Sequence, residues 1–195
     1  MLGGVTETVG RRERKKAATR QALADAALEL FLARGYDAVG VREIADAADV
    51  SVTTLFKHFP DGKEALVFDD DANREATLVA VVRDRPAGLS IPAALHRFLR
   101  AEQAGLGAQP RFADFLRLVR ETPALQEHAR RMWLRHEVRL AGAIADESGL
   151  PPDDAACQAL AHFALEAVGL ARGHADPGAA LDRIFGLLAD GWGKS

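Results

Sequence analysis

The chain has 195 residues, of which 48% are hydrophobic, so one large domain or two small ones can bury a sizeable core. The formal net charge of −3 excludes a uniformly basic nucleic-acid binder but allows a local basic patch. The single cysteine, Cys157, excludes an internal disulfide and a cysteine-based zinc site.

The first ten residues, MLGGVTETVG, contain no apolar segment of the kind that a signal peptide requires. The longest uncharged apolar run, residues 155–165, is too short to cross a membrane. We therefore expect a cytoplasmic protein that does not enter a membrane.

Charge is distributed unevenly along the chain. Residues 11–20, RRERKKAATR, contain six basic residues and one acidic residue, whereas residues 64–195 contain 15 basic and 19 acidic residues. We expect residues 1–14 to form a flexible basic arm. It is either a solvated, disordered leader or a contact for an anionic partner at one end of the molecule.

The first predicted helix covers about residues 14–34. Apolar residues recur there at helical spacing and form one stripe, made of Leu23, Ala27, Leu30 and Phe31. Gly35 ends this helix, because glycine adopts the positive φ that a helix C-terminus favours. A second, short helix has its apolar stripe at Val41, Ile44, Ala45 and Ala48.

The segment SVTTLFKHFP, residues 51–60, predicts a third helix with two different faces. Ser51 is a good N-cap, since its hydroxyl accepts a hydrogen bond from a free backbone amide. Leu55 and Phe59 should point to the core, and the helix should end before Pro60.

A fourth helix is expected from Asp61 to Arg85, with Asp61 and Glu64 forming a capping box. Proline, glycine and capping residues then delimit further helices, at about 92–103, 110–121, 122–148, 153–173 and 177–192. Strand signals are nearly absent. The predicted fold is all-α, with a three-helix head at residues 15–63 and a larger bundle at residues 64–195.

Two short helices joined by a tight turn are typical of a helix-turn-helix, whose second helix lies in the DNA major groove. Thr53 and Thr54 suit contacts with bases, while Lys57 and His58 suit phosphate or base acceptors. The alternative is an ordinary three-helix cluster with a polar surface. The whole arrangement, rather than any one residue, favours DNA binding.

The segment VREIADAADVSVTTLFKHFPDGKEAL, residues 41–66, resembles the DNA-binding signature of the TetR family of bacterial regulators. The preceding LADAALELFLARGYDAVGV resembles the family's first helix, and the similarity covers about residues 15–70. Three positions depart from the family pattern. Phe56 replaces the usual tyrosine, Asp49 replaces a common glycine in the turn, and Lys63 comes one residue late, which leaves its reach open.

The head therefore presents one set of residues expected at DNA, drawn from the basic leader and from both helices of the motif. They are Arg14, Lys15, Lys16, Arg20, Arg42, Ser51, Val52, Thr53, Thr54, Phe56, Lys57, His58 and Lys63.

The resemblance implies a homodimer that binds a palindromic DNA operator, with the last two helices of each subunit forming the interface. It also implies a small-molecule effector in the larger domain that changes the spacing of the two heads. The expected interface residues, which could instead form the subunit's own core, are Ala156, Leu160, Phe163, Ala167, Leu170, Leu181, Ile184, Phe185 and Leu188.

Aromatic and aliphatic residues of the middle helices either line a ligand pocket or fill a core, and a few polar residues could anchor a ligand. The candidates are Phe98, Phe112, Phe115, Leu116, Val119, Met132, Trp133, His136, His162 and Glu166. The segment RETPALQEHARRMWLRHEVRLAGAIADESGLPPDD weakly resembles family members thought to sense acyl-thioester-like ligands. Neither a metal site nor a cofactor is expected, because no histidine follows a glutamate at the spacing of a bundle site.

Three hypotheses follow. The first is a DNA-binding repressor released by a small, largely apolar ligand. The second is a DNA-binding regulator without a small-molecule effector. The third is an all-helical enzyme or carrier whose head serves only packing, although no catalytic motif supports it.

Overall fold

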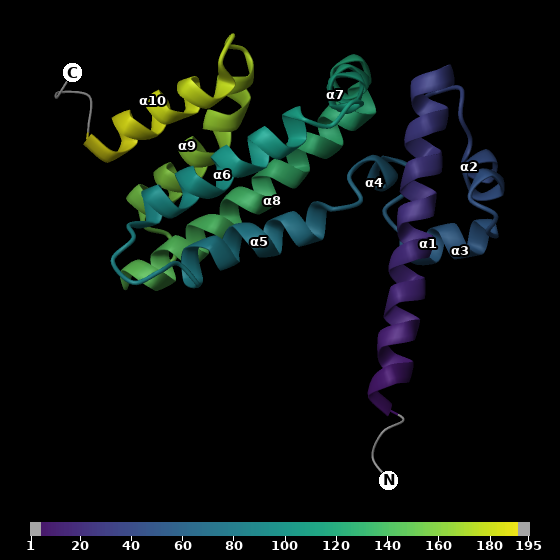
Figure 1. Ribbon diagram of the computed structural model, residues 1–195, viewed down its shortest axis with the longest axis horizontal. Coiled ribbons are helices and arrows are strands. Elements are labelled where there is room, and N and C mark those ends of the chain that lie inside the picture. The colour runs from purple at the N-terminus through teal and green to yellow at the C-terminus, as the bar shows by residue number, and fades with distance from the viewer. Residues whose placement is uncertain (1–4, 191–195) are drawn as a thin grey trace. The chain divides into compact units, whose positions relative to one another are not determined.

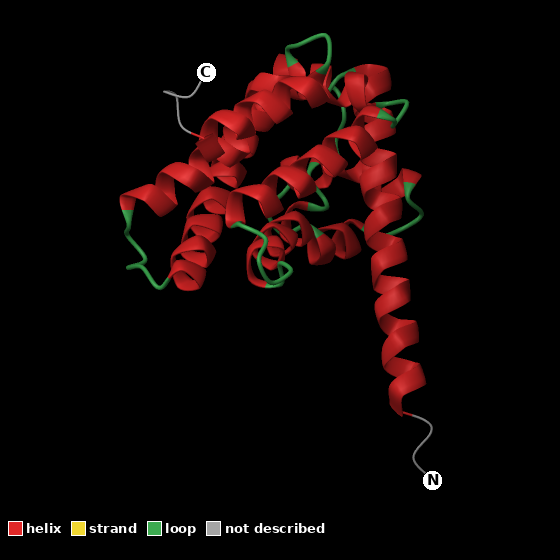
Figure 2. Cartoon of the chain, turned by 60° about the vertical axis from the view of Figure 1, so that its left-hand side comes forward, coloured by secondary structure: helices red, strands yellow, loops and turns green. Residues whose placement is uncertain are grey.

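The computed structural model describes residues 5–190, and all regular elements in this range are helices (Figures 1 and 2). The predicted all-α fold is thus confirmed for the described residues. The helices are α1 (Val5–Arg34), α2 (Val41–Ala47), α3 (Val52–His58), α4 (Glu64–Val67), α5 (Asp71–Arg83), α6 (Ile91–Gly107), α7 (Phe112–Glu121), α8 (Pro123–Ser148), α9 (Ala155–Arg172) and α10 (Pro177–Asp190).

The chain divides into two compact units. The head unit runs to Asp70 and includes Ala113–His128, while the body unit consists of Asp71–Phe112 and the chain from Ala129 onward. Residues 64–70 and 113–128 therefore group with the head, although the sequence placed both segments in the larger domain. These segments group with the head because their apolar side chains Leu66, Leu118 and Leu125 are buried in the same core as the first three helices.

Helix α1 begins at Val5, earlier than the predicted start near Arg14. The described part of the expected flexible arm, residues 5–14, is therefore helical. The segment RRERKK consists of good helix formers and contains no residue that would stop a helix growing backward from Leu23. At the other end Gly35 has a φ of 83°, which confirms its predicted role in ending the helix.

The core of the head unit is small and apolar. Leu23 and Phe31 of α1 meet Ile44 of α2 and Leu55 of α3, and all four side chains are fully or almost fully buried. Leu55 and Phe59 are buried as predicted, at 0% and 1% exposure, so α3 is held by the face opposite its polar residues.

The predicted fourth helix is wrong in detail, because the chain forms two helices, α4 and α5, with a break between them. The Asp69 carbonyl oxygen lies in this break and accepts hydrogen bonds from Arg20 Nε and Nη2, at 3.3 and 2.8 Å. The expected capping box is also absent. The N-cap residue is Lys63, no side chain caps α4, and the Glu64 carboxylate instead accepts a hydrogen bond from the Tyr36 hydroxyl at 2.7 Å.

The body unit contains α5, α6, the main part of α8, α9 and α10, with α10 packed against α6 and α9 (Figure 1). Helix α9 buries alanines at positions 161, 164, 167 and 171, and such small side chains allow neighbouring helices to approach closely. Leu99, Leu140 and Leu181 complete the centre of this core. Asp176 Oδ1 accepts a hydrogen bond from the Ala179 amide at 2.9 Å, which confirms the predicted cap before Pro177.

Candidate nucleic-acid interface

The turn between α2 and α3 is tight because Asp49 adopts a left-handed conformation. Its φ of 53° is the only positive φ of a non-glycine residue in the described chain. The Val50 amide then donates to the Ala45 carbonyl oxygen at 2.9 Å, which closes the turn. Aspartate tolerates this conformation better than most residues, so Asp49 forms the turn at a position where glycine is common in the family that the sequence resembles.

The start of α3 is fixed by Ser51. Its Oγ accepts a hydrogen bond from the Thr54 amide at 3.1 Å and lies 2.9 Å from Thr54 Oγ1. Ser51 is thus the N-cap that the sequence predicted. This contact also restricts Thr54, which is half-buried, whereas Thr53 is exposed. Of the two threonines, Thr53 is the one that is free to contact DNA.

The outer face of α3 combines polar and apolar groups. Thr53 and Lys57 are exposed, and Phe56 keeps 45% of its surface exposed although it is a large hydrophobic residue. Val52, by contrast, is half-buried against the head core. A short helix that is anchored by Leu55 and exposes Thr53, Phe56 and Lys57 suits insertion into a DNA groove.

His58 lies at the C-terminal end of α3 in a cationic neighbourhood. Partial burial lowers the pKa of its imidazole, and the charges of Arg20, Lys16 and Lys57 lower it further. The ring therefore stays neutral near pH 7. The positive charge of Lys16, on the basic leader, thus acts on the end of α3.

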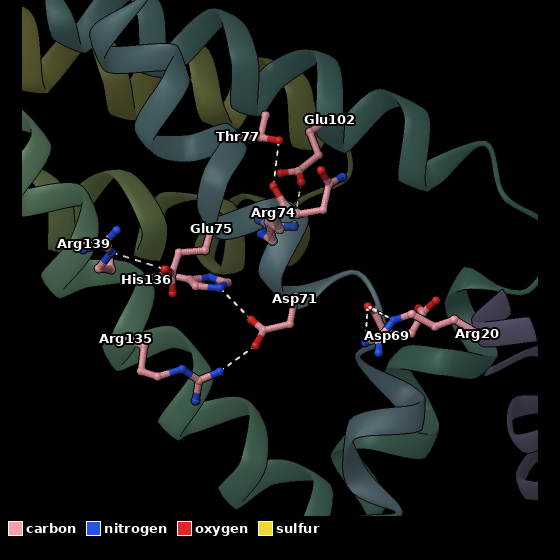
Figure 3. A network of polar contacts seen from close by, with 11 residues as sticks. Arg20, Asp69, Asp71, Arg74, Glu75, Thr77, Glu102, Arg135, His136 and Arg139 are labelled. Atoms are coloured by element: carbon pink, nitrogen blue, oxygen red, sulfur yellow. Dashed lines mark hydrogen bonds and ion pairs between the residues drawn. The ribbon is translucent and has the colours of Figure 1, made fainter. Parts of the chain in front are cut away.

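Two of the residues expected at DNA are instead engaged inside the head. Arg20 donates through Nη1 to the His58 carbonyl oxygen at 2.7 Å, and its guanidinium lies 4.2 Å from the Phe59 ring centroid. Figure 3 shows its second contact, with the Asp69 carbonyl. Arg20 therefore joins α1 to the end of α3 and to the break before α5. We no longer propose it as a phosphate ligand.

Lys63 is likewise turned inward. Its Nζ donates to the carbonyl oxygens of Tyr36 and Val39, at 2.8 and 3.1 Å, and lies 3.8 Å from the Tyr36 ring centroid. Gly62, whose φ is 95°, provides the sharp turn that precedes it. The extra residue before Lys63 is thus accommodated by that turn, and the lysine stabilises the loop between α1 and α2.

The remaining predicted contacts stay available at the surface. Arg14, Lys15 and Lys16 are exposed along α1, and Arg42 is exposed in the first turn of α2. Of the residues expected at DNA, these four and Thr53, Phe56 and Lys57 have exposed side chains that could meet a partner.

The predicted ligand-site residues belong to both units. Phe115 and Val119 pack against the head core, and Leu116 is half-buried in the same unit. In the body unit Phe98 and Trp133 pack against the core and Met132 is buried. Phe112 is half-buried at the start of α7.

The three polar anchors also have separate environments. His136 is fully buried and its Nε2 lies 2.7 Å from Asp71 Oδ1, a carboxylate that Arg135 also contacts (Figure 3). His162 and Glu166 are exposed on α9, and His162 Nδ1 lies 3.0 Å from Glu137 Oε2. The hydrogen bond with Glu137 raises the pKa of His162. The structure thus does not bring His162 and Glu166 to the apolar candidates.

The predicted interface residues form two groups. Ala167, Leu181 and Phe185 are buried in the body core, so they contribute to the subunit's own packing. Leu160, Ile184 and Leu188 are partly buried against that core. Ala156, Phe163 and Leu170 are exposed and recur every seven residues on one face of α9. Leu187 of α10, at 39% exposure, was missed, although a partly apolar stripe on the last helix could have indicated it.

Neither a membrane segment nor a metal site emerges among residues 5–190. No helix in this range combines the length and hydrophobicity needed to cross a bilayer. No three His, Cys, Asp or Glu side chains of the same range gather so that they could hold a metal ion.

A short anchored helix after a tight turn, with exposed Thr53 and Lys57 and basic residues beside it, defines a helix-turn-helix DNA-binding protein. Comparison with protein families agrees. Residues 23–69 match the model described as bacterial regulatory proteins of the tetR family, and residues 89–193 match the MftR C-terminal domain. The chain belongs to the TetR family and is a DNA-binding transcriptional regulator.

Individual relatives are also named as transcriptional regulators. TcmR of Streptomyces glaucescens is 37% identical over 153 residues, which cover 74% of this chain and 67% of TcmR. The putative mycofactocin biosynthesis regulator MftR of Mycobacterium tuberculosis is 28% identical over 137 residues, covering 70% of this chain and 69% of MftR.

Solved structures share the fold. Thermus thermophilus FadR, a TetR-family repressor in complex with lauroyl-CoA, matches with a TM-score of 0.56 and 25% identity over 89% of this chain and 94% of FadR. NalD of Pseudomonas aeruginosa, the secondary repressor of a multidrug efflux pump, matches with a TM-score of 0.58 and 19% identity over 90% of this chain and 97% of its own.

Proposed function

We propose that the chain is a repressor that binds a palindromic operator as a homodimer and is released by a small molecule held in the body unit. The observation that carries the DNA-binding part is the geometry of α3. The helix is anchored by Leu55 and Phe59 and capped by Ser51, and it leaves Thr53, Phe56 and Lys57 exposed. A rigid anchor combined with an open outer face is what groove binding requires.

Thr53 is proposed to contact base edges, and Lys57 to contact phosphate or a base acceptor. Arg42 and the exposed leader residues Arg14, Lys15 and Lys16 add contacts with the DNA backbone. Phe56 takes the place of a hydroxyl-bearing tyrosine, so we propose that it makes an apolar contact, for example with a thymine methyl group.

The homodimer is proposed to form through α9 and α10. Phe163 and Leu170 are 52% and 57% exposed, and large apolar side chains that recur on one helix face favour burial in an interface. A two-fold dimer would place its two α3 helices in successive major grooves, about 34 Å apart.

The dimer is tested by measuring molar mass in solution with light scattering. We expect a dimer for the unmodified protein and a monomer for the double variant Phe163→Asp, Leu170→Asp. Leu150→Asp is the matched control, because Leu150 is also an exposed leucine of the body unit, at 45%, but lies outside both helices. The proposed interface would be contradicted if the double variant stayed a dimer while the control Leu150→Asp became a monomer.

DNA binding is tested by fluorescence anisotropy on duplexes that tile the region upstream of the gene. We expect tight, salt-sensitive binding to one tile and loss of that binding in the monomeric double variant. Equal, weak binding to every tile by the unmodified protein would contradict the proposed operator.

The effector part rests on the two-unit organisation and on family resemblance. FadR of Thermus thermophilus was solved with lauroyl-CoA, and the body unit here has an aromatic and aliphatic interior that suits an apolar ligand. Because an effector that weakens DNA binding must itself bind less well to the DNA-bound form, operator DNA should lower its affinity by the same factor. If no small molecule releases the protein from its operator, the second hypothesis, a DNA-binding regulator without a small-molecule effector, holds instead.

A further inference from the structure

An ion pair inside the body unit keeps several polar atoms without a hydrogen-bond partner among the described residues. Arg74 of α5 contacts Glu102 of α6, with 2.6 Å between Nη1 and Oε1 (Figure 3). The two side chains are only 16% and 19% exposed. Polar atoms of ion pairs that are buried from solvent normally find further hydrogen bonds.

Here those atoms stay unpartnered within the described part of the chain. Arg74 Nε and Nη2 and Glu102 Oε2 are buried without a hydrogen-bond partner, and so are both amide atoms of the neighbouring Gln103. The Nε–H and one Nη2–H of a guanidinium lie on the same edge and point in the same direction. That edge is the fork that binds a carboxylate through two parallel hydrogen bonds.

A second cation, the half-buried Arg172, interacts electrostatically with this ion pair. Arg172 of α9 has a buried Nε that also has no partner among the described residues. Burial lowers the pKa of Arg172, the charge of Arg74 lowers it further, and Glu102 partly opposes this. Two guanidinium groups and one carboxylate leave the cluster with a net charge of +1, which one bound monoanion neutralises.

Aromatic rings accompany both cations. The Arg74 guanidinium lies 4.8 Å from the Trp133 ring centroid, and the Arg172 guanidinium lies 5.4 Å from that of Phe112. A cationic group that is stacked on an aromatic ring and keeps free donors suits a ligand with a charged end and an apolar body.

We propose that Arg74, Glu102, Gln103 and Arg172 bind the polar end of the effector, and that the effector is an apolar molecule ending in a carboxylate. The carboxylate accepts from the free edge of Arg74 and from Arg172. A hydroxyl group near the carboxylate donates to Glu102 Oε2 or to the Gln103 carbonyl oxygen. This inference deepens the proposed function, on which its effector role rests, and it replaces His162 and Glu166 as polar anchors.

The probe is 3-hydroxydecanoate, compared with decanoate and with methyl 3-hydroxydecanoate, whose ester removes the negative charge. Binding is followed by the fluorescence of Trp133 in a Trp192→Phe background, since the chain has two tryptophans. We expect the hydroxy acid to bind best, decanoate more weakly, and the ester at least about tenfold more weakly than the acid, which corresponds to one charge-assisted contact.

Arg74→Lys is the decisive variant, because it keeps the buried charge beside Glu102 and removes the two-donor edge. It should weaken binding of the acid about tenfold or more while barely changing binding of the ester. Arg83→Lys is the matched control. Arg83 is also an arginine of α5, and it forms an exposed ion pair with Asp146.

Arg172→Met provides a second readout. Replacing a half-buried cation whose Nε has no partner among the described residues with an apolar side chain should leave the melting temperature of the free protein unchanged or raised. The same variant should lose affinity for the acid. A purely structural role for Arg172 predicts the opposite, namely a lower melting temperature and unchanged binding.

Equal binding of acid and ester, or no response of Trp133 to either acid, would overturn the proposal. Operator binding by the unliganded protein is measured separately, so this failure leaves the DNA-binding function intact. If the acid binds but never releases the operator, the anion site stands and the effector role is refuted.

Discussion

Lys57 and Lys63 carry the same charge, lie six positions apart and should behave in opposite ways when replaced by alanine. Lys57 is exposed on α3, whereas Lys63 donates two hydrogen bonds to backbone carbonyl oxygens inside the head. The pair therefore separates a residue that binds DNA from one that holds the fold.

The magnitudes follow from these contacts. Hydrogen bonds from a charged donor contribute about 1.5 to 3 kcal/mol each when buried, so losing both in a partly buried site should cost about 3 kcal/mol. At about 2 to 4 °C per kcal/mol, Lys63→Ala should lower the melting temperature by about 6 to 12 °C. Lys57→Ala should change stability by less than about 0.5 kcal/mol, as expected for an exposed side chain.

The assays are thermal unfolding of the free protein and operator affinity across a salt series. Lys57→Ala should weaken operator binding and reduce the slope of log K against log salt by about one if the lysine meets phosphate. Lys63→Ala, measured well below its melting temperature, should keep the slope of the unmodified protein. The reasoning is refuted if Lys63→Ala reduces the slope and leaves the melting temperature unchanged.

Three further predictions concern the local geometry of the head. Ser51→Ala should destabilise the head by about 1 kcal/mol, and Ser51→Gly by only a few tenths. Both variants lose the hydroxyl that caps α3, but glycine is tolerated at an N-cap position and alanine is not. Urea unfolding measures both changes in stability. Asp49→Val should cost more than about 1 kcal/mol because a β-branched residue is strained at positive φ, whereas Asp49→Gly should be tolerated; a greater loss for glycine would contradict the assigned turn. The depressed pKa of His58 means that the unfolded chain binds the proton more readily. Stability should therefore be complete above the ordinary histidine pKa and fall as the pH drops through it toward the folded value, and His58→Gln should flatten this dependence in melting curves between pH 5 and pH 8.

Much of the fold could be predicted because its helices are amphipathic and clearly delimited. Leu55 and Phe59 were assigned to the core from spacing alone, and Ser51 and Asp176 were recognised as caps from residue type and position. The turn at Asp49 was located through the family resemblance, in which glycine is common at this position, and its φ of 53° agrees with that placement.

The errors have a common cause, which is contact between residues far apart in the sequence. The break between α4 and α5 accompanies hydrogen bonds from Arg20 to the Asp69 carbonyl, 49 positions away. Lys63 faces inward because the acceptors of its hydrogen bonds, on Tyr36 and Val39, lie on a different loop. No local pattern in the sequence signals either contact.

The candidate effector site was missed for a related reason. Arginines and glutamates on amphipathic helices are usually solvated, so Arg74, Glu102 and Arg172 gave no reason to expect burial. The histidines His136 and His162 were selected from the sequence as polar anchors instead, because imidazole is a common functional group. Only the tertiary structure shows that nitrogen atoms of both arginines are buried and that Arg74 keeps an edge without a partner among the described residues.

The central claim is that α3 binds one operator through its exposed face. The most direct test is the anisotropy of the unmodified protein and of Thr53→Ala on duplexes tiling its upstream region, at two salt concentrations. The structure predicts tight, salt-sensitive binding to one tile, and a loss in Thr53→Ala on that tile without a change in melting temperature. Equal affinities of the two proteins for every tile would contradict the claim.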